Sequence, residues 1–413
     1  MGSSKNKMRV LQILLIFISI NLLGQNIDDC INTYQHEIKS TDIIKDNSDL
    51  FFLSKFTENK DIISLGEATH GSSEVFKIKH RIIKYLIEEE DFNIFAIEAN
   101  MAEAELLNKY IQTGKGDPKK LLAYLNYWVW NTKEVLDLIL WLREYNETHE
   151  KKVVFTGFDM QSYRVALHNI NKLYTKDNEI IDNIISKLDT INDKIINERK
   201  KGIYQINDSL IEEFYNESRL LYKQIKLIEN KPENYNLLLQ NSVLLVQFAT
   251  RYSKHKPKHG YRDLCMAKNI KWIKDNYKNS KIIIWAHNGH VKRDKYTMGA
   301  YMKEEGLEAY VIGFSVWKGF YTAIANGKIA KNELIIPNKD CYEYFFNKSN
   351  LPIFFIDLNF LKADKNCSFI KEHMNFREIG SMKRDEQFYK SNLIKEYDGI
   401  INIKETNASE LLF

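Results

Sequence analysis

Six short apolar segments recur along the chain and restrict the folds that it can adopt. They are rich in Ile, Val and Phe and nearly continuous, at residues 62–66, 94–99, 152–159, 281–287, 309–314 and 352–359. Strands that are covered on both faces have this composition, because neither face needs polar side chains. We therefore expect these segments to be the buried strands of a largely parallel sheet.

Segments with helical periodicity lie between the apolar runs. Residues 73–89 and 134–146 both repeat apolar side chains at helical spacing. Strands that alternate with helices predict an α/β fold with a central, mostly parallel sheet flanked by helices. Residues 165–250 break this alternation, because they are long, charged and helix-periodic. We predict that they form a large helical insertion beside the sheet, as a lid or as part of the wall of an active-site cleft.

The N-terminal residues resemble an export signal. Lys5, Lys7 and Arg9 precede an apolar stretch at residues 10–24, which is short for a membrane span. We expect a signal peptide at residues 1–25, a single α/β domain at residues 26–413, and a periplasmic or secreted protein without stable membrane insertion. The alternatives are a membrane-anchoring helix and a buried core helix.

Charge and cysteine content bear on partners and metals. The chain has 59 basic and 55 acidic residues and no long basic block, which argues against a nucleic-acid partner. Its cysteines have long, irregular spacings and form no CxxC pair, so a thiolate zinc site is not indicated. An even number of cysteines permits disulfides in an exported protein, but the sequence does not pair them.

Titratable side chains follow or end four of the predicted strands. They are Glu67, His70, Glu98, Asp159, His287 and His290. Ligands bind beyond the carboxyl ends of the strands in open α/β sheets, so these side chains are expected to face one crevice. A single carboxylate or histidine in such a place is more often a helix cap, a salt-bridge partner or a structural residue. The recurrence at successive strand ends favours a catalytic or metal site.

Two kinds of chemistry fit this set of residues. A neutral imidazole can take a proton from water while a neighbouring carboxylate fixes its tautomer. The sequence has no GxSxG motif, P-loop or GxGxxG motif, which favours attack by an activated water over a covalent intermediate. The pairs Glu67 with His70 and His287 with His290 are each three residues apart, a spacing that also occurs in metal sites. A metal-dependent hydrolase therefore remains the alternative.

Six segments together resemble the erythromycin esterase family over roughly residues 60–320. They are GEATHGSSEVFKIKHRIIKYLIEE, FAIEAN, WVWNTKEVLDLILWLREYN, VVFTGFDMQ, YRDLCMAKNIKWI and IIIWAHNGHVKR. The resemblance implies hydrolysis of the macrolactone ester of macrolide antibiotics, with neither a metal nor another cofactor, and hence macrolide resistance. It also implies that a small-molecule macrolide is the partner.

The resemblance assigns roles to the histidines and to their carboxylate partners. His70 matches the general base for water, and Glu67 and Glu98 match its carboxylate partners. His287 and His290 match a second histidine pair that could polarise the ester carbonyl or protonate the leaving alcohol. The same crevice can be reached from further positions along the chain.

Other candidates come from helix geometry and from the neighbouring motifs. Glu74 lies four residues after His70, on the same helix face, and is therefore a further catalytic candidate. Arg262 is a candidate catalytic cation, with a structural salt bridge as the alternative. Lys79 stands where some family members have Arg; it is a candidate for substrate binding, with a solvated surface lysine as the alternative.

Four further residues complete the predicted substrate site. Trp128, Trp130 and Met298 could form an apolar wall, although core packing is favoured for the tryptophans. Asp159 is placed with them because it ends the third strand. Two other functions stay open beside the esterase: hydrolysis of an unrelated ester on the same scaffold, and non-enzymatic binding of an apolar ligand.

Overall fold

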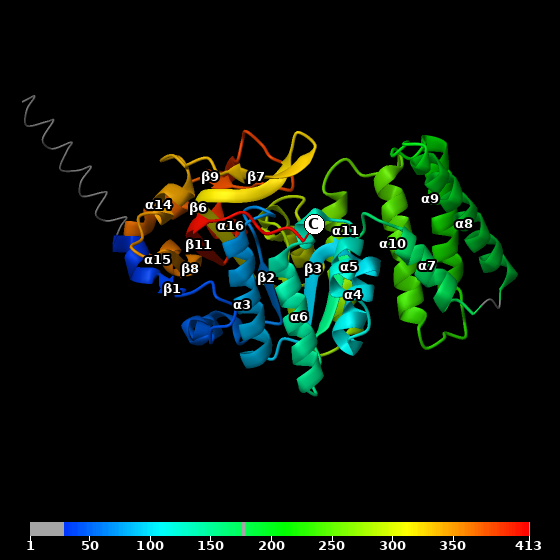
Figure 1. Cartoon of the computed structure of the whole chain (residues 1–413), viewed down its shortest axis with the longest axis horizontal. Helices are drawn as coiled ribbons and strands as arrows, with labels where there is room; N and C mark the ends of the chain where they lie inside the picture. Colours follow the sequence, from blue (N-terminus) through cyan, green and yellow to red (C-terminus); the bar gives the residue numbers. More distant parts are fainter. Residues whose placement is uncertain (1–28, 176–177, 413) are drawn as a thin grey trace, which may run out of the picture.

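A large mixed sheet forms the centre of the computed structural model, which describes residues 29–175 and 178–412 (Figure 1). Its strands follow the spatial order β1 (His36–Glu37), β8 (Ile353–Asp357), β11 (Gly399–Thr406), β6 (Tyr310–Ala325), β2 (Ile62–Leu65), β5 (Ile282–Trp285), β3 (Ile94–Asn100) and β4 (Val154–Asp159). Every pairing from β11 to β4 is parallel, whereas β8 pairs antiparallel with both β1 and β11.

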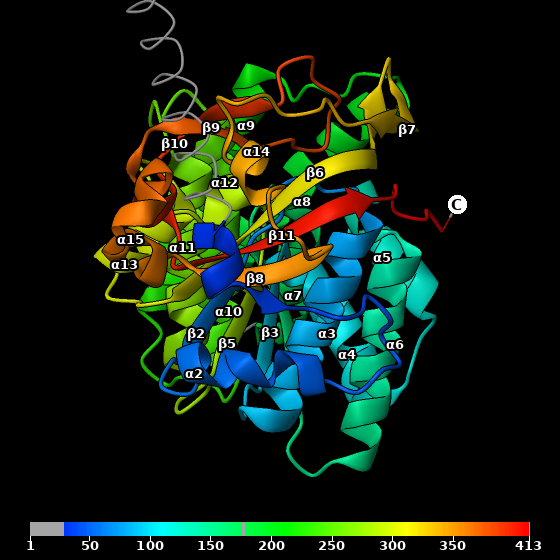
Figure 2. The same ribbon diagram turned by 90° about the vertical axis from the view of Figure 1, so that its left-hand side faces the viewer.

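Helices cover both faces of the sheet. On one side lie α3 (Ser73–Glu89), α4 (Met101–Thr113), α5 (Pro118–Tyr124) and α6 (Lys133–Thr148), and on the other lie α11 (Tyr261–Asn276), α12 (Asn288–Val291) and α13 (Met298–Glu304) (Figure 2). The strands are apolar throughout because each face packs against its own core. In β2, for example, Ile62 belongs to one core, and Ile63 and Leu65 belong to the other.

Four helices follow β4 and lie beyond it at one end of the molecule (Figure 1). They are α7 (Arg164–Leu173), α8 (Glu179–Lys200), α9 (Asp208–Lys226) and α10 (Tyr235–Tyr252). The side chain of Asn178 accepts hydrogen bonds from backbone amides in the first turn of α8, and Asn207 does the same for α9. Their buried residues recur at helical spacing, so each helix places one apolar face in the shared core.

The opposite end is built from the N-terminal and C-terminal segments together. It contains η1 (Ser48–Leu53), α2 (Ser54–Thr57), α14 (Tyr342–Phe346), α15 (Leu358–Ala363), η3 (Lys365–Lys371) and α16 (Leu393–Glu396), with the two-stranded sheet β9 (Met374–Arg377) and β10 (Phe388–Ser391). A disulfide joins Cys30 to Cys367, while Cys265 and Cys341 are free and buried. None of the helices in the described residues is both long and apolar enough to cross a membrane.

The predicted fold class is confirmed: the chain is a mixed α/β protein with a central, mostly parallel sheet flanked by helices. The strand predicted at residues 309–314 is much longer, because β6 continues to Ala325 and pairs there with β7 (Lys328–Glu333). This extension leaves several side chains partly exposed, so it lacks the apolar signature of the buried strands. The expected signal peptide at residues 1–25 lies outside the described residues.

Candidate active site

The order of the strands brings the predicted site residues together. β5 lies between β2 and β3, and Trp285 is level with Leu65 on one side and with Ile97 on the other. Segments distant in the sequence therefore end next to one another at the carboxyl edge of the sheet. Asp159 ends β4, the next strand along, level with Asn100.

Glu67 and His70 form the first part of the site, in the turn between β2 and α3. His70 Nδ1 lies 2.6 Å from Glu67 Oε1, and the rings of His70 and His287 are 4.9 Å apart. Gly66 precedes the pair because a side chain there would collide with Asn288, whose side chain bonds the backbone of β6 at Phe314. The close approach fixes the turn against its neighbouring strands.

The carboxylate of Glu67 is fully buried and held by three donors. Its Oε2 accepts hydrogen bonds from Lys79 Nζ at 2.9 Å and from Trp285 Nε1 at 2.6 Å, while Oε1 faces His70. Burial raises the pKa of Glu67, but the charge of Lys79 and the bond to His70 outweigh it and lower the pKa below its ordinary value. Glu67 is therefore an anion at neutral pH, with His70 as its outermost partner.

Lys79 supports this carboxylate from the protein interior. Its ammonium lies 4.4 Å from the centre of the Trp285 ring, and the side chain is completely buried. Burial lowers the pKa of Lys79 to about 8, although Glu67 opposes the shift. The alternative of a solvated surface lysine is therefore wrong. The prediction that Lys79 binds the substrate directly is also wrong, because its side chain is not accessible to solvent.

Arg262 joins the ends of β3 and β4 into a second charged cluster. Its guanidinium bonds Glu98 Oε1 at 2.6 Å and Asp159 Oδ2 at 2.7 Å. Burial raises the pKa of Glu98, but His290 and Arg262 bring it well below its ordinary value. The salt-bridge alternative for Arg262 is thus realised, and Asp159, fully buried, holds the arginine rather than a substrate.

His290 lies between two carboxylates. Its Nδ1 is 2.7 Å from Asp263 Oδ1, and its Nε2 is 3.3 Å from Glu98 Oε1 and 3.0 Å from an Arg262 nitrogen. Burial lowers the pKa of His290, but Glu98 and Asp263 outweigh it and raise the pKa to about 10. His290 is therefore a cation at neutral pH. The sequence prediction missed Asp263, although it directly follows Arg262 in the quoted motif.

His287 has the opposite electrostatic character. Its Nε2–H donates to the carbonyl of Ile379 at 3.0 Å, and its Nδ1 accepts a hydrogen bond from the Gly289 amide at 3.1 Å. Burial, with the neighbouring His70, lowers the pKa of His287 to about 3. Both ring nitrogens are occupied and the ring is neutral. In this arrangement His287 cannot donate a proton to the leaving alcohol, contrary to the role expected from the sequence.

A C-terminal segment missed by the sequence prediction covers the turn after β2. Besides accepting from His287, Ile379 donates its backbone N–H to the Ala68 carbonyl at 2.8 Å. The neighbouring Glu378 pairs with Lys292, just beyond α12. These contacts are made mainly by backbone groups, so no residue type marked them in the sequence.

The remaining candidates do not meet at the cluster. The carboxylate of Glu74 accepts from Thr406 Oγ1 at 2.8 Å and from the backbone amide of Asn407 at 2.6 Å, so it fixes the C-terminal segment instead. Met298 is fully buried. Both are corrections to the predicted site, because the geometry directs Glu74 away from His70 and gives Met298 no exposed surface for a substrate.

The two tryptophans differ in their surroundings. Trp130 is buried, donates its indole N–H to the Glu98 carbonyl at 3.2 Å and packs edge-on against Trp285. Trp130 therefore packs in the core, as the alternative stated, and does not form part of a substrate-binding wall. Trp128 is half-buried, and its indole nitrogen has no hydrogen-bond partner among the described residues.

The donor set does not fit a metal ion. Glu67 and Glu98 are surrounded by N–H donors, and both nitrogens of His287 are used by backbone groups. A metal needs these lone pairs free. In the ranges 29–175 and 178–412 no group of three His, Cys, Asp or Glu side chains is arranged to hold a metal.

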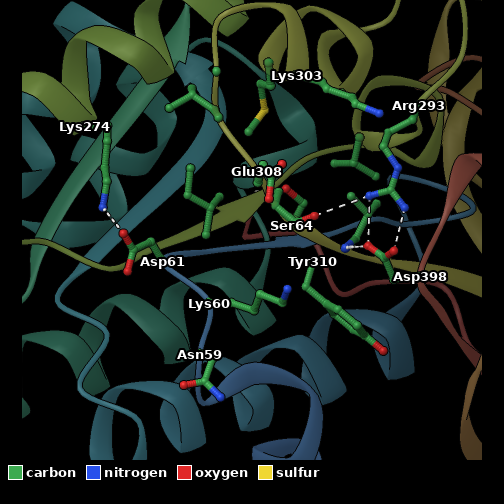
Figure 3. A pocket seen from close by; sticks show the side chains of 18 residues that line it. Asn59, Lys60, Asp61, Ser64, Lys274, Arg293, Lys303, Glu308, Tyr310 and Asp398 are labelled. Carbon is green, nitrogen blue, oxygen red and sulfur yellow. Dashed lines mark hydrogen bonds and ion pairs between the residues drawn. The ribbon is translucent and has the colours of Figure 1, made fainter.

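The cavity drawn in Figure 3 lies at the other edge of the sheet. It has a volume of about 500 Å³ and lies where β2 and β6 begin, with the ion pair of Arg293 and Asp398 at its side. None of the predicted site residues lines it. The candidate catalytic residues therefore lie away from this cavity, at the carboxyl edge of the sheet.

The sequence as a whole decides the family. The family model described as erythromycin esterase matches residues 87–406. The chain belongs to the erythromycin esterase family. This membership gives it a hydrolase role, consistent with the buried charged site.

Individual relatives of the erythromycin esterase family match nearly the whole chain at low identity. YbfO of Bacillus subtilis (strain 168), named only provisionally as a hydrolase, is 24% identical and aligns over 89% of this chain and 88% of its own. Erythromycin esterase type II of Escherichia coli is also 24% identical, over 89% of this chain and 95% of its own. A solved mutant of the erythromycin esterase EreC, in its open conformation, superposes with a TM-score of 0.73 at 15% identity and covers 90% of this chain and 98% of its own.

Proposed function

We propose that this chain hydrolyses a macrolactone ester of the erythromycin type, using a water molecule activated by His70. The observation that carries the proposal is the contact of 2.6 Å between His70 and the buried anion Glu67. The other ring nitrogen, Nε2, makes no hydrogen bond with the described residues, and the side chain is 11% exposed. The Nδ1 atom of the imidazole is thus held by Glu67, and the Nε2 atom is available to a water.

The first step is proton transfer from water to His70. Glu67 accepts a hydrogen bond from Nδ1–H, which places the lone pair on Nε2 and stabilises the imidazolium that forms. Lys79 and Trp285 prevent the carboxylate from turning away. A general base in this arrangement contributes roughly 10²–10⁴-fold to the rate.

The second step is attack of hydroxide on the ester carbonyl, which creates a negative oxygen. His290 and Arg262 supply positive charge nearby, and each side chain is 20% exposed. Fixed charges in a partly dry site stabilise a developing oxyanion more strongly than water does. When the carbon–oxygen bond breaks, the ring alkoxide leaves and takes the proton that His70 removed from water, so the base is regenerated and the lactone becomes a hydroxy acid.

The location of the protein is proposed to be extracytoplasmic, either periplasmic or secreted. The disulfide between Cys30 and Cys367 supports this, because such bonds persist in oxidising compartments. The substrate is proposed to be a small molecule, and nothing in the proposal requires a nucleic acid or a stable membrane contact.

The test follows the mass of erythromycin after incubation with the purified protein, with and without a chelator. We expect the drug to gain one water in both samples. His70→Ala should lower turnover by roughly 10²-fold or more, while His168→Ala, a change at an exposed histidine, should leave it unchanged.

Each other result points to a different function. A gain that disappears with chelator would indicate a metal-dependent hydrolase. Binding of the drug without a product would indicate a sequestering protein. A folded protein that neither binds nor cleaves erythromycin would overturn the macrolide proposal, and activity retained by His70→Ala would overturn the assigned base.

A further inference from the structure

A second cleft lies where β3 and β4 end against the helices α7, α8 and α10. It has a volume of about 450 Å³, and its floor includes Asn100 at the end of β3 and Gln161 just after β4. A hollow of about 290 Å³ shares Gln161, Arg199 and two aromatic side chains of α10 with it. Because the two cavities share these residues, they are treated together as one recess beside α7, α8 and α10.

The recess borders the charged cluster of the active site. Gln161 Nε2 donates to Asp159 Oδ2 at 2.7 Å, and the same carboxylate oxygen binds Arg262. Asn100 holds the loop in place, since its side-chain oxygen accepts from the backbone amides of Gln161 and Ser162. A molecule in the recess would therefore be separated from Asp159, the partner of Arg262, by the side chain of Gln161.

Two arginines line this recess without a carboxylate partner. Arg164 begins α7 and Arg199 lies near the end of α8; both are exposed, and neither forms an ion pair with any described residue. Asp208 lines the smaller hollow. Glu103 interacts electrostatically with Arg164, but its side chain is buried, and this burial raises the pKa of its carboxyl group. Apart from these two arginines, the residues that line the larger cleft are uncharged, so its lining is positive.

Aromatic side chains form the rest of the wall. Tyr127, Phe248 and Tyr252 line the larger cleft, and Tyr252 is 47% exposed. Burial and the charge of Asp159 raise the pKa of Tyr127 far above its ordinary value, so its hydroxyl remains a hydrogen-bond donor. Two arginines in a cleft that is also lined by aromatic side chains suit a planar or ring-shaped group that carries an acid.

We propose that this recess is a subsite for an anionic group, such as a carboxylate, sulfate or phosphate, attached to a ring of the ester substrate. Arg164 and Arg199 bind the anion, and the side chains of α10 contact the ring. The inference rests on the ester hydrolysis proposed for His70 and not on erythromycin as the preferred substrate, because erythromycin carries a basic amine and no acid. It adds the charge of the ester that the chain prefers to cleave. An ester with an acidic substituent is then preferred over its neutral counterpart.

The first test is binding, which does not depend on catalysis. Calorimetry with 2-naphthalenesulfonate and with neutral 2-naphthol compares the same ring with and without an anion. We expect the sulfonate to bind at least about tenfold more tightly, and salt to weaken it. Arg164→Ala and Arg199→Ala should each remove most of this preference, whereas Lys200→Ala, a neighbouring exposed lysine that does not line the recess, should retain it.

The variants also separate this proposal from the proposed function. His70→Ala should bind the sulfonate as the natural chain does, so loss of hydrolysis with retained binding would leave the subsite intact. No measurable binding of the sulfonate, equal binding of the two probes, or an equal loss in Lys200→Ala would overturn the subsite. None of these three outcomes would alter the assignment of His70 as the base.

Discussion

At the scale of single residues, the site depends on which charges are buried and what faces them. Glu67 is inaccessible to solvent, yet it is an anion because Lys79, Trp285 and His70 surround it. A buried charge of this kind is tolerated only while its partners remain. The same contacts that keep Glu67 ionised also orient His70, so stability and catalysis share these side chains.

Replacement of Glu67 by Gln is expected to separate the two contributions. The change should lower kcat by roughly 10²–10⁴-fold, because the amide can present the wrong hydrogen-bonding group to His70. It should also cost about 3–5 kcal/mol of unfolding free energy, because Lys79 is left buried and unpaired. Adding Lys79→Met should restore part of the stability but none of the turnover, as measured by urea unfolding and steady-state kinetics. Recovery of both together would show that Glu67 is only structural.

His290 gives a prediction about pH. Its pKa in the folded protein is about 10, against an ordinary value of 6.5, so its stabilising contribution is complete below about pH 6.5 and is lost as pH rises towards 10. The difference in unfolding free energy between the natural chain and His290→Gln should therefore shrink from pH 6 to pH 9, by at most about 1.4 kcal/mol per pH unit. Urea unfolding at several pH values measures it. A difference that does not change with pH would contradict the raised pKa.

At the scale of helices and strands, the sequence predicted the parts of the site that follow regular patterns. Apolar runs located β2, β3, β4 and β5, and the polar residues that end them were correctly expected to meet. Asp263 and the Ile379 backbone were missed for different reasons. Asp263 lies on a helix, where an acid normally faces solvent, and Ile379 contributes peptide groups that every residue carries. Such contacts depend on tertiary packing, which no local pattern records.

Helix α3 contains a histidine that has no part in the proposed chemistry. His80 is buried against Trp141 of α6, and both of its ring nitrogens lack hydrogen-bond partners in the described part of the chain. Burial lowers the pKa of His80 to about 3. The unfolded chain takes up a proton there below about pH 6.5 and the folded chain does not, so this residue destabilises the fold as pH falls.

His80→Leu should therefore stabilise the protein. Removing two unsatisfied polar atoms should add about 1–3 kcal/mol to the unfolding free energy at pH 8. The gain should be larger at pH 5, because the unfavourable proton uptake is also removed. Thermal or urea unfolding at both pH values tests this, with the exposed His168→Leu as the matched control. A variant that is less stable than the natural chain, or a gain that does not grow at pH 5, would show that the imidazole is satisfied.

At the scale of the whole molecule, chain segments far apart in the sequence close the structure around the sheet. Cys30 and Cys367 are 337 residues apart and join the start of the described chain to η3. Farther along, the C-terminal segment contacts Ala68 and His287 through Ile379. Cys367 thus belongs to the same C-terminal part of the chain as Ile379, which contacts the active site.

A protein prepared under oxidising conditions should show this disulfide chemically and energetically. Alkylation of the unfolded, unreduced chain should modify two cysteines, Cys265 and Cys341, and all four after reduction. The double change Cys30→Ser with Cys367→Ser should lower the free energy of unfolding by about 2–5 kcal/mol. Without the disulfide the unfolded chain is no longer closed into a long loop, so its conformational entropy rises. A reductant should lower the Tm of the natural chain and leave that of the double variant unchanged. Alkylation of all four cysteines without reduction would show that the pair is not bonded, and would remove the support that it gives to an extracytoplasmic location.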